Sequence, residues 1–207
     1  MDRVKWLFFD IGSTLVDESL VYEYRFGELA AKSGKSTEYI YDKAMEYYRQ
    51  NKKGDKEVAS LLGLKPPAWD TKRERLYPDT EEVLINLHEK YKIGIIANQM
   101  YGTEDRLEAF GIRKFIDVVV ASAEEGVEKP DKRIFEIAFE RAGCIPEEAV
   151  MIGDRIDNDI VPAKKLGMKT IWIRQGFGRL WQLSGEEEKP DYEVSSLTTS
   201  SVSPVLI

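Results

Sequence analysis

The N-terminal region contains the stretch Phe8-Phe9-Asp10-Ile11-Gly12-Ser13-Thr14-Leu15. It closes an apolar run that begins at Val4, so it predicts a buried strand that ends at Asp10. The glycine two positions later predicts a flexible turn, which would leave the carboxylate of Asp10 exposed beyond the strand. An aspartate in this position is either a cap for the turn or a reactive group. The rest of the chain decides between these two interpretations.

Four later apolar runs share with the first a lack of polar alternation. Such runs are typical of strands that are covered on both faces. The segments between the later runs carry apolar residues every three or four positions, as amphipathic helices do. Strands that alternate with helices predict a doubly wound parallel α/β sheet, whose ligand site lies beyond the carboxyl ends of the strands. The predicted strands are residues 4–9, 93–97, 118–121, 149–153 and 169–173.

Residues 17–77 interrupt this alternation. They contain no convincing strand, and they predict a small helical insertion into an α/β core made of residues 1–16 and 78–207. The insertion is rich in aromatic side chains, which either pack among its own helices or line a substrate pocket. Packing is the favoured interpretation. The predicted helices of the insertion are residues 19–33, 36–53 and 55–62.

Composition and charge exclude several classes of function. Of the 207 residues, 43% are apolar and 32% are charged, which is typical of an ordered globular protein. The net charge of −7 repels phosphate backbones, so we expect no nucleic-acid partner. The apolar run after Val4 is too short for a signal peptide or a membrane span, so we expect a cytoplasmic protein without a membrane partner. A monomer and a homodimer are both compatible with the sequence.

The chain has one cysteine, Cys144, and one histidine, His88. A lone cysteine forms no internal disulfide and no cysteine metal site. A lone histidine excludes a histidine-rich metal site. Any metal site would therefore be built from oxygen ligands.

Polar residues follow the ends of the predicted strands. Asp10 and Asn98 end the first two, and the third is followed by Gly126-Val127-Glu128-Lys129-Pro130-Asp131. The fourth runs into Ile152-Gly153-Asp154-Arg155-Ile156-Asp157-Asn158-Asp159. Because the carboxyl ends of parallel strands meet at one edge of a sheet, a lysine and up to four carboxylates would gather around Asp10.

This arrangement predicts a particular chemistry. Clustered acids repel one another unless a cation neutralises them, and an all-oxygen set favours Mg²⁺. A lysine beside a carboxylate keeps that group ionised and balances the charge of a transferred phosphoryl group. A carboxylate that attacks phosphorus forms an aspartyl-phosphate, which is a known covalent strategy.

The order of these motifs resembles the haloacid dehalogenase superfamily over nearly the whole chain. The shared features are D-x-x-x-T after the first strand, a polar pair after the second, a Lys-Pro lysine and a later G-D-x-x-x-x-D. The resemblance implies that Asp10 is the nucleophile and that Lys129 balances charge. It also implies that the helical insertion is a cap that closes over small substrates. The implied metal ligands are the side chains of Asp10 and Asp154 and the backbone carbonyl of Gly12, with Asp159 supporting the site.

The sequence departs from the family pattern at two positions. Family phosphatases carry a second aspartate two residues after the nucleophile, which protonates the leaving group, and here that residue is Gly12. The serine or threonine after the second strand is replaced by Ala97, so Asn98 and Gln99 are the candidates to bind a phosphoryl oxygen. Thr14 matches the family threonine, and its alternative role is bonding within the turn.

Three functions remain open at this point. The favoured one is a Mg²⁺-dependent hydrolase of a small phosphorylated metabolite, with weakened or substrate-assisted proton transfer. The second is a catalytically impaired binding or regulatory module. The third is dehalogenase-like or phosphonatase-like chemistry. It is disfavoured because dehalogenases work without metal whereas Asp154, Asp157 and Asp159 are retained, and because no buried cap lysine stands out.

Overall fold

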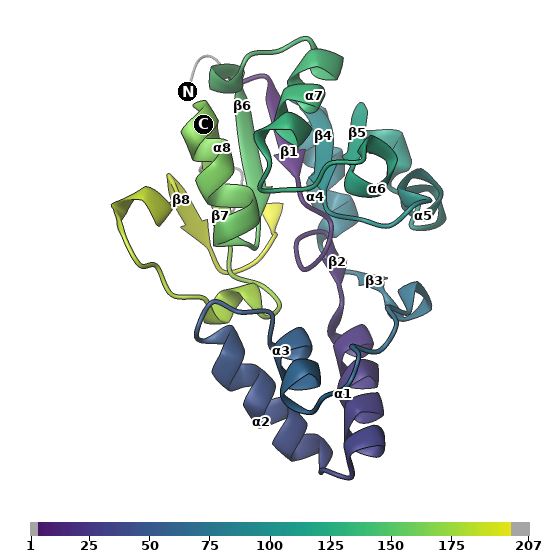
Figure 1. The fold of residues 1–207 in the computed structure, drawn as a ribbon. Helices are drawn as coiled ribbons and strands as arrows, with labels where there is room; N and C mark the ends of the chain where they lie inside the picture. The colour runs from purple at the N-terminus through teal and green to yellow at the C-terminus, as the bar shows by residue number, and fades with distance from the viewer. Residues whose placement is uncertain (1–3, 200–207) are drawn as a thin grey trace.

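The computed structural model describes residues 4–199 and contains one large parallel sheet. Its strand order is β5-β4-β1-β6-β7-β8, and all neighbouring strands are parallel (Figure 1). Five of the six strands are the predicted ones, so the prediction of a doubly wound α/β fold is confirmed. The strands are β1 (Trp6–Phe9), β4 (Lys92–Ala97), β5 (Val118–Ala121), β6 (Ala149–Gly153), β7 (Lys169–Ile173) and β8 (Tyr192–Val194).

Strand β8 lies at the edge of the sheet and was not predicted. It is three residues long, and only Val194 among its side chains is buried. So short a strand, exposed on one side, leaves no apolar run in the sequence. It is anchored through Asp191, whose carboxylate accepts hydrogen bonds from the backbone N–H and the hydroxyl of Thr170, both at 2.9 Å.

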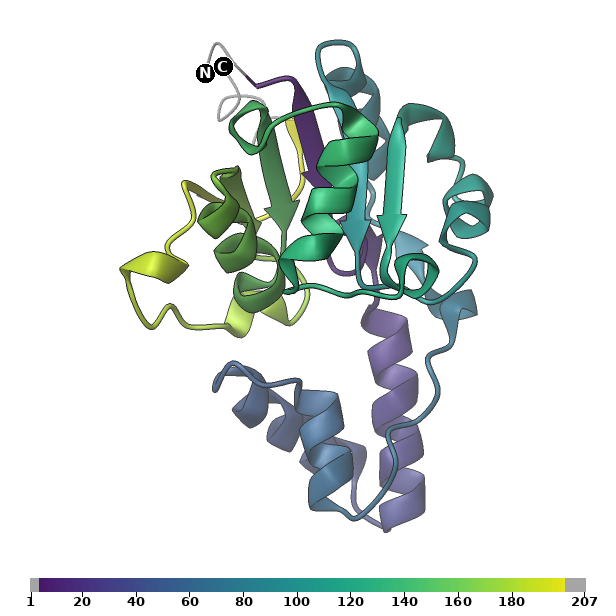
Figure 2. The same ribbon diagram turned by 45° about the horizontal axis from the view of Figure 1, so that its top comes forward.

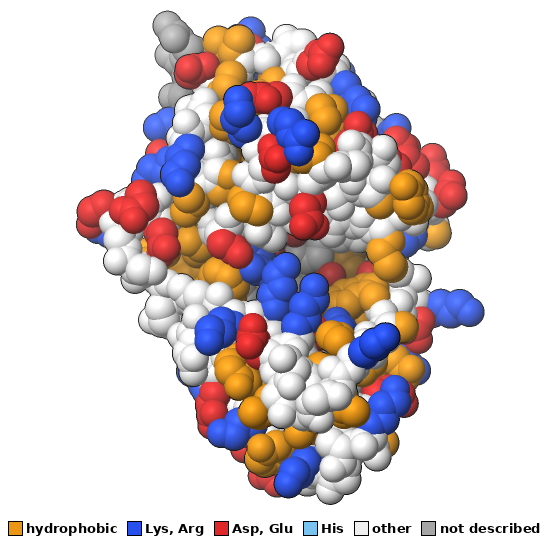
Figure 3. Space-filling model, viewed as in Figure 1, with side chains coloured by type: hydrophobic (Ala, Val, Ile, Leu, Met, Phe, Trp, Pro, Cys, Tyr) orange, Lys and Arg blue, Asp and Glu red, His pale blue; other side chains and the backbone are white. Residues whose placement is uncertain are grey.

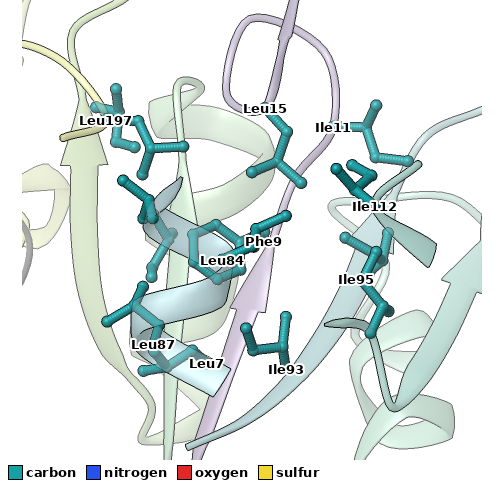
Figure 4. Close-up of a cluster of buried hydrophobic side chains, with 14 of the residues drawn as sticks. Leu7, Phe9, Ile11, Leu15, Leu84, Leu87, Ile93, Ile95, Ile112 and Leu197 are labelled. Atoms are coloured by element: carbon teal, nitrogen blue, oxygen red, sulfur yellow. The ribbon is translucent and has the colours of Figure 1, made fainter. Parts of the chain in front are cut away.

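Helices cover both faces of the sheet (Figure 2). On one face Leu7 and Phe9 of β1 pack with Leu84 and Leu87, and Figure 4 shows this cluster. On the other face, Phe8 packs with apolar residues of α7 and α8. Because both faces are buried, the strands lack polar alternation. The helices of the core are α4 (Thr80–His88), α5 (Thr103–Ala109), α6 (Ser122–Glu125), α7 (Lys132–Ala142) and α8 (Val161–Leu166). No helix within residues 4–199 is both long enough and apolar enough to cross a lipid bilayer.

Three helices between β1 and β4 form a separate lobe at the carboxyl edge of the sheet (Figure 1). They are α1 (Ser19–Ser33), α2 (Thr37–Tyr48) and α3 (Gly54–Leu61). A short antiparallel pair, β2 (Val16–Asp17) and β3 (Arg75–Leu76), lies where the chain leaves and re-enters the core. The lobe has its own hydrophobic cluster, but Phe177 of the core stacks on Tyr48 at 4.4 Å. The division into a core and a cap at residues 17–77 stays a prediction, and we call residues 17–77 the cap below.

Helices α2 and α3 of the cap pack closely at Gly54, the first residue of α3. A Cβ at Gly54 would overlap the backbone oxygen of Ala44 and would lie 2.6 Å from ring atoms of Tyr48. We therefore expect Gly54→Ala to destabilise the protein by roughly 1–3 kcal/mol, because a backbone atom yields little space. Gly27→Ala in α1 is the matched control, since nothing lies within 4 Å of a Cβ there. Urea unfolding of both variants tests this, and equal stabilities would contradict it.

Candidate active site

Three carboxylates meet at the carboxyl ends of the two central strands. Asp10 follows β1, and its backbone N–H continues the pairing with β6 by donating to Ile152 O at 2.9 Å. Asp154 follows β6 directly. Asp159 is the fourth residue of a π-helical turn, Ile156–Ile160, which precedes α8. One oxygen from each of Asp10, Asp154 and Asp159 lies within 4.8 Å of the others. Two of the carboxylates that the motifs place near Asp10, those of Asp154 and Asp159, therefore meet it here.

Lys129 is the cation that joins this cluster. Its Nζ donates hydrogen bonds to Asp10 Oδ1 at 2.8 Å, to Asp159 Oδ1 at 2.5 Å and to the Ile96 carbonyl at 2.7 Å. The side chain is 1% exposed. Burial acts to lower the pKa of Lys129, but the carboxylates of Asp10 and Asp159 outweigh burial and raise it. Lys129 therefore remains a buried positive charge in contact with the predicted nucleophile.

The carboxylates of the cluster repel one another, and this repulsion disfavours their charged forms. Burial, together with the charges of Asp159 and Asp10, raises the pKa of Asp154 well above its ordinary value. Burial also raises the pKa of Asp159 to about 6, although Lys129 opposes this shift. One lysine thus does not neutralise the cluster.

The donor set fits a hard divalent cation. Asp10 and Asp154 offer carboxylate oxygens, and Gly12 lines the same cavity. Ligands of this kind suit Mg²⁺, which prefers oxygen and is often bound by one or two carboxylates. The position of the Asp159 side chain requires a glycine at residue 153, because a Cβ there would lie 2.5 Å from Asp159 Cγ. Asp157 does not join the cluster, since it is exposed and pairs with Arg155 at 2.6 Å.

The two predicted substrate amides lie on the cavity wall with other bonds already made. The amide of Asn98 exchanges two hydrogen bonds with the backbone of Lys129, at 2.7 and 2.9 Å. Gln99 Oε1 accepts a hydrogen bond from Arg106. Asn98 therefore positions the loop that carries Lys129, whatever contact it makes with a ligand.

Thr14 lies away from the cavity. Its side chain is fully buried, it does not line the cavity, and its Oγ1 has no hydrogen-bond partner among the described residues. This geometry gives no support to the predicted contact between Thr14 and a substrate.

A cavity of about 490 Å³ separates the acidic cluster from the cap. Figure 3 shows the molecule hollowed between its two lobes, with Lys and Arg side chains gathered beside the hollow. On the cap side, buried Arg25 and Asp55 form an ion pair at 2.6 Å, and Tyr48 donates to Asp55 at 3.2 Å. The space is large enough for a small metabolite.

The sequence interpretation missed the charged residues of the cap. Arg25, Lys53, Asp55 and Lys56 all line the cavity. Partial burial, together with the nearby charge of Arg155, lowers the pKa of Lys53. By surface area both Lys53 and Lys56 are exposed at the cavity wall. Within the cap these residues look like ordinary polar positions on a helix or directly before one, so no pattern marks them.

Glu18 is another cavity-lining residue that the sequence interpretation did not single out. Its carboxyl group lies against Gly12, where a Cβ would be 2.9 Å from Glu18 Cδ and 3.1 Å from Glu18 Oε2. Burial, with the charge of Asp10, raises the pKa of Glu18 to about 8, although a hydrogen bond from Ser13 opposes the shift. Position 12 itself has no acidic side chain, but the carboxyl group of Glu18 lies next to it.

An acidic cluster with one buried lysine lies at the carboxyl edge of a doubly wound sheet and faces the cap helices across a cavity. This arrangement agrees with the class of hydrolase that the motifs of the sequence resemble. The family model described as haloacid dehalogenase-like hydrolase matches residues 7–173. The chain belongs to this family, and the resemblance inferred from its motifs is confirmed.

Individual relatives agree with this assignment. A glyceraldehyde 3-phosphate phosphatase from Methanopyrus kandleri is 39% identical over 120 residues, which are 57% of this chain and 52% of that protein. A protein of the same name from Pyrococcus furiosus is 29% identical over an alignment covering 95% of this chain and 91% of its own. The crystal structure of a HAD phosphatase from Thermococcus onnurineus has a TM-score of 0.67 and 25% identity over 98% of each chain. The matches span about half the length of the first curated relatives.

Proposed function

We propose that this protein is a Mg²⁺-dependent phosphatase of a small phosphorylated metabolite, with Asp10 as the nucleophile. The observation that carries the proposal is the contact between the Asp10 carboxylate and buried Lys129, inside a cluster with Asp154 and Asp159 that faces the cavity. The names of the relatives from Methanopyrus kandleri and Pyrococcus furiosus support phosphate-ester hydrolysis and make glyceraldehyde 3-phosphate the first substrate to test.

In the proposed reaction an oxygen of Asp10 attacks phosphorus, the bond to the leaving oxygen breaks, and an aspartyl-phosphate forms. Water then attacks the same phosphorus and regenerates the Asp10 carboxylate. Lys129, which donates to Asp10 Oδ1, balances the charge of the phosphoryl group. Asp10, Asp154 and the Gly12 carbonyl would hold Mg²⁺, with Asp159 supporting them. When bound, the ion supplies positive charge to the phosphoryl oxygens.

The amides of Asn98 and Gln99 are the proposed contacts of a phosphoryl oxygen, in place of the hydroxyl that Ala97 lacks. The cytoplasmic location and the choice between a monomer and a homodimer stay predictions from the sequence. A binding module without turnover and a metal-free reaction at carbon are the alternatives, and the following experiment separates all three.

The test is a screen of phosphorylated metabolites, led by glyceraldehyde 3-phosphate, with phosphate release measured with and without Mg²⁺. We expect removal of metal with a chelator to lower turnover by on the order of a hundredfold or more, and added Mg²⁺ to restore it. Mg²⁺ binding without turnover of any substrate would favour the binding module. Halide release from a haloacid without metal would favour the reaction at carbon.

Metal binding is also measurable without turnover. We expect Asp154→Asn to weaken Mg²⁺ binding, followed by calorimetry, because the variant loses one charged ligand. Asp105→Asn, an exposed acid on α5, is the matched control and should bind Mg²⁺ like the native protein. Equal affinities for the two variants would remove Asp154 from the metal site.

A further inference from the structure

We propose that Glu18 is the catalytic acid and base of this active site, in the place of the aspartate that Gly12 lacks. The inference rests on the proposed phosphatase function and adds the residue that handles the proton. It accounts for an enzyme that keeps the nucleophile, the lysine and the metal acids but has no side chain at position 12.

The space beside Gly12 is filled by the carboxyl group of Glu18. Of all atoms near a Cβ built on Gly12, the closest is Glu18 Oε1, followed by Glu18 Cδ at 2.9 Å and Oε2 at 3.1 Å. A side chain on residue 12 would have to displace this carboxyl group. The glycine and the glutamate therefore complement each other, since the absence of one side chain makes room for the other.

Glu18 is also held in this place by its surroundings. It immediately precedes α1, and its backbone carbonyl accepts from the N–H groups of Val21 and Tyr22 at 3.0 and 3.1 Å. Ser13, one residue after Gly12, donates its hydroxyl to Glu18 Oε2 at 3.1 Å. The carboxyl group is thus tied to the turn that follows Asp10, and it lines the same cavity as Asp10 and Lys129.

A purely structural role would be to cap α1, and the carboxyl group does not do this. Glu18 occupies the N-cap position, yet its side chain makes no capping hydrogen bond. Capping residues stabilise a helix by accepting from its first free N–H groups. The side chain of Glu18 instead points back to the turn after the nucleophile.

The proton transfers balance over the two steps. As Asp10 attacks, the bond between phosphorus and the leaving oxygen breaks, and the carboxyl proton of Glu18 passes to that oxygen. The resulting Glu18 carboxylate then takes a proton from the water that attacks the aspartyl-phosphate. The bond between phosphorus and Asp10 breaks, inorganic phosphate leaves, and Glu18 is protonated again.

This role makes a prediction that depends on the leaving group. A basic alkoxide needs a proton as it departs, whereas a nitrophenolate does not, and such help is worth about 10²- to 10⁴-fold. For Glu18→Gln we expect kcat/KM on glyceraldehyde 3-phosphate to fall by about a hundredfold or more and kcat/KM on p-nitrophenyl phosphate to fall by less than about fivefold. The kcat for both substrates should fall, because hydrolysis of the aspartyl-phosphate loses its base. A burst of nitrophenolate equal to the enzyme concentration should appear.

A relocated carboxyl group provides the second test. Gly12→Asp combined with Glu18→Ala restores the family arrangement without crowding, so alkyl-phosphate hydrolysis should return to within about tenfold of native. Gly12→Asp alone should bring no gain, because its side chain meets Glu18. Glu28→Gln, on the helix α1 that Glu18 precedes, is the matched control; Glu28 pairs with Lys32, and the variant should match the native protein on both substrates. Thermal unfolding of each variant checks that the protein is folded.

Each outcome bears on a different claim. Equal losses of kcat/KM on both substrates, or failure of the double variant to recover while folded, would overturn the acid-base role. If the native protein hydrolyses alkyl phosphates and Glu18→Gln hydrolyses them with the same kcat/KM, the acid-base role of Glu18 is wrong but the proposed phosphatase function stands. If the native protein hydrolyses neither substrate, nor any other phosphate ester, both the proposed function and the acid-base role of Glu18 are wrong.

Discussion

Replacement of Asp10 by asparagine is expected to reduce phosphate release to below about one hundredth of the native rate while the protein stays folded. An amide cannot act as the nucleophile, and it also removes a negative charge from the proposed metal ligands. The fold should survive because Lys129 still donates to Asp159 and to the Ile96 carbonyl. Steady-state kinetics on glyceraldehyde 3-phosphate at saturating Mg²⁺ measure the loss.

Two controls make this result specific. Asp105→Asn changes an exposed acid and should retain the native rate. Mass spectrometry of rapidly quenched native protein should find a phosphoryl group on Asp10, and the variant should carry none. Turnover of the Asp10 variant above one part in about a hundred at matched purity would rule out this residue as the nucleophile.

Lys129→Ala is expected to cause the second large effect, on both activity and stability. The substitution leaves Asp10 and Asp159 without the cation that they share, inside a site where the Asp159 side chain is 1% exposed. Breaking a buried ion pair by removing one partner costs about 3–5 kcal/mol. We expect turnover to fall by about a hundredfold or more as well, because the phosphoryl charge is no longer balanced.

Lys132→Ala is the matched control for this prediction. Lys132 lies three residues further along, is exposed on α7 and pairs with Glu136 at 2.8 Å, so its loss should change neither quantity by much. Urea unfolding and kinetics at several Mg²⁺ concentrations test both variants. A Lys129 variant with native stability and rate would show that the lysine is dispensable for the cluster.

Most of the fold was predictable because it depends on patterns local to each segment. A strand buried on both faces needs several apolar residues in succession, as at Val150, Met151 and Ile152 of β6, all nearly unexposed. The parallel order of such strands then brings their carboxyl ends to one edge, so Asp10, Lys129 and Asp154 were expected near one another. The edge strand β8 was missed because one buried side chain forms no pattern.

The parts of the site that could not be predicted depend on pairs of residues from different segments. The ion pair between Arg25 and Asp55 joins two cap helices, and neither residue differs in local sequence from a surface charge. Likewise, Thr14 matches the family motif, but the packing of the turn buries its side chain away from the cavity.

The sequence by itself determined the α/β class and predicted the strand edge at which Asp10, Asp154 and Asp159 meet, because periodicity and chain order are sufficient for these. It did not separate these acids from Asp157, which lies outside the cluster. It also determined that position 12 lacks an acid. Only the tertiary structure decided what stands there instead, because the turn after β1 and the start of α1 must fold together before Glu18 meets Gly12. Contacts of this kind depend on the angles of a turn and the rotamer of one side chain, which leave no periodic signal in the chain.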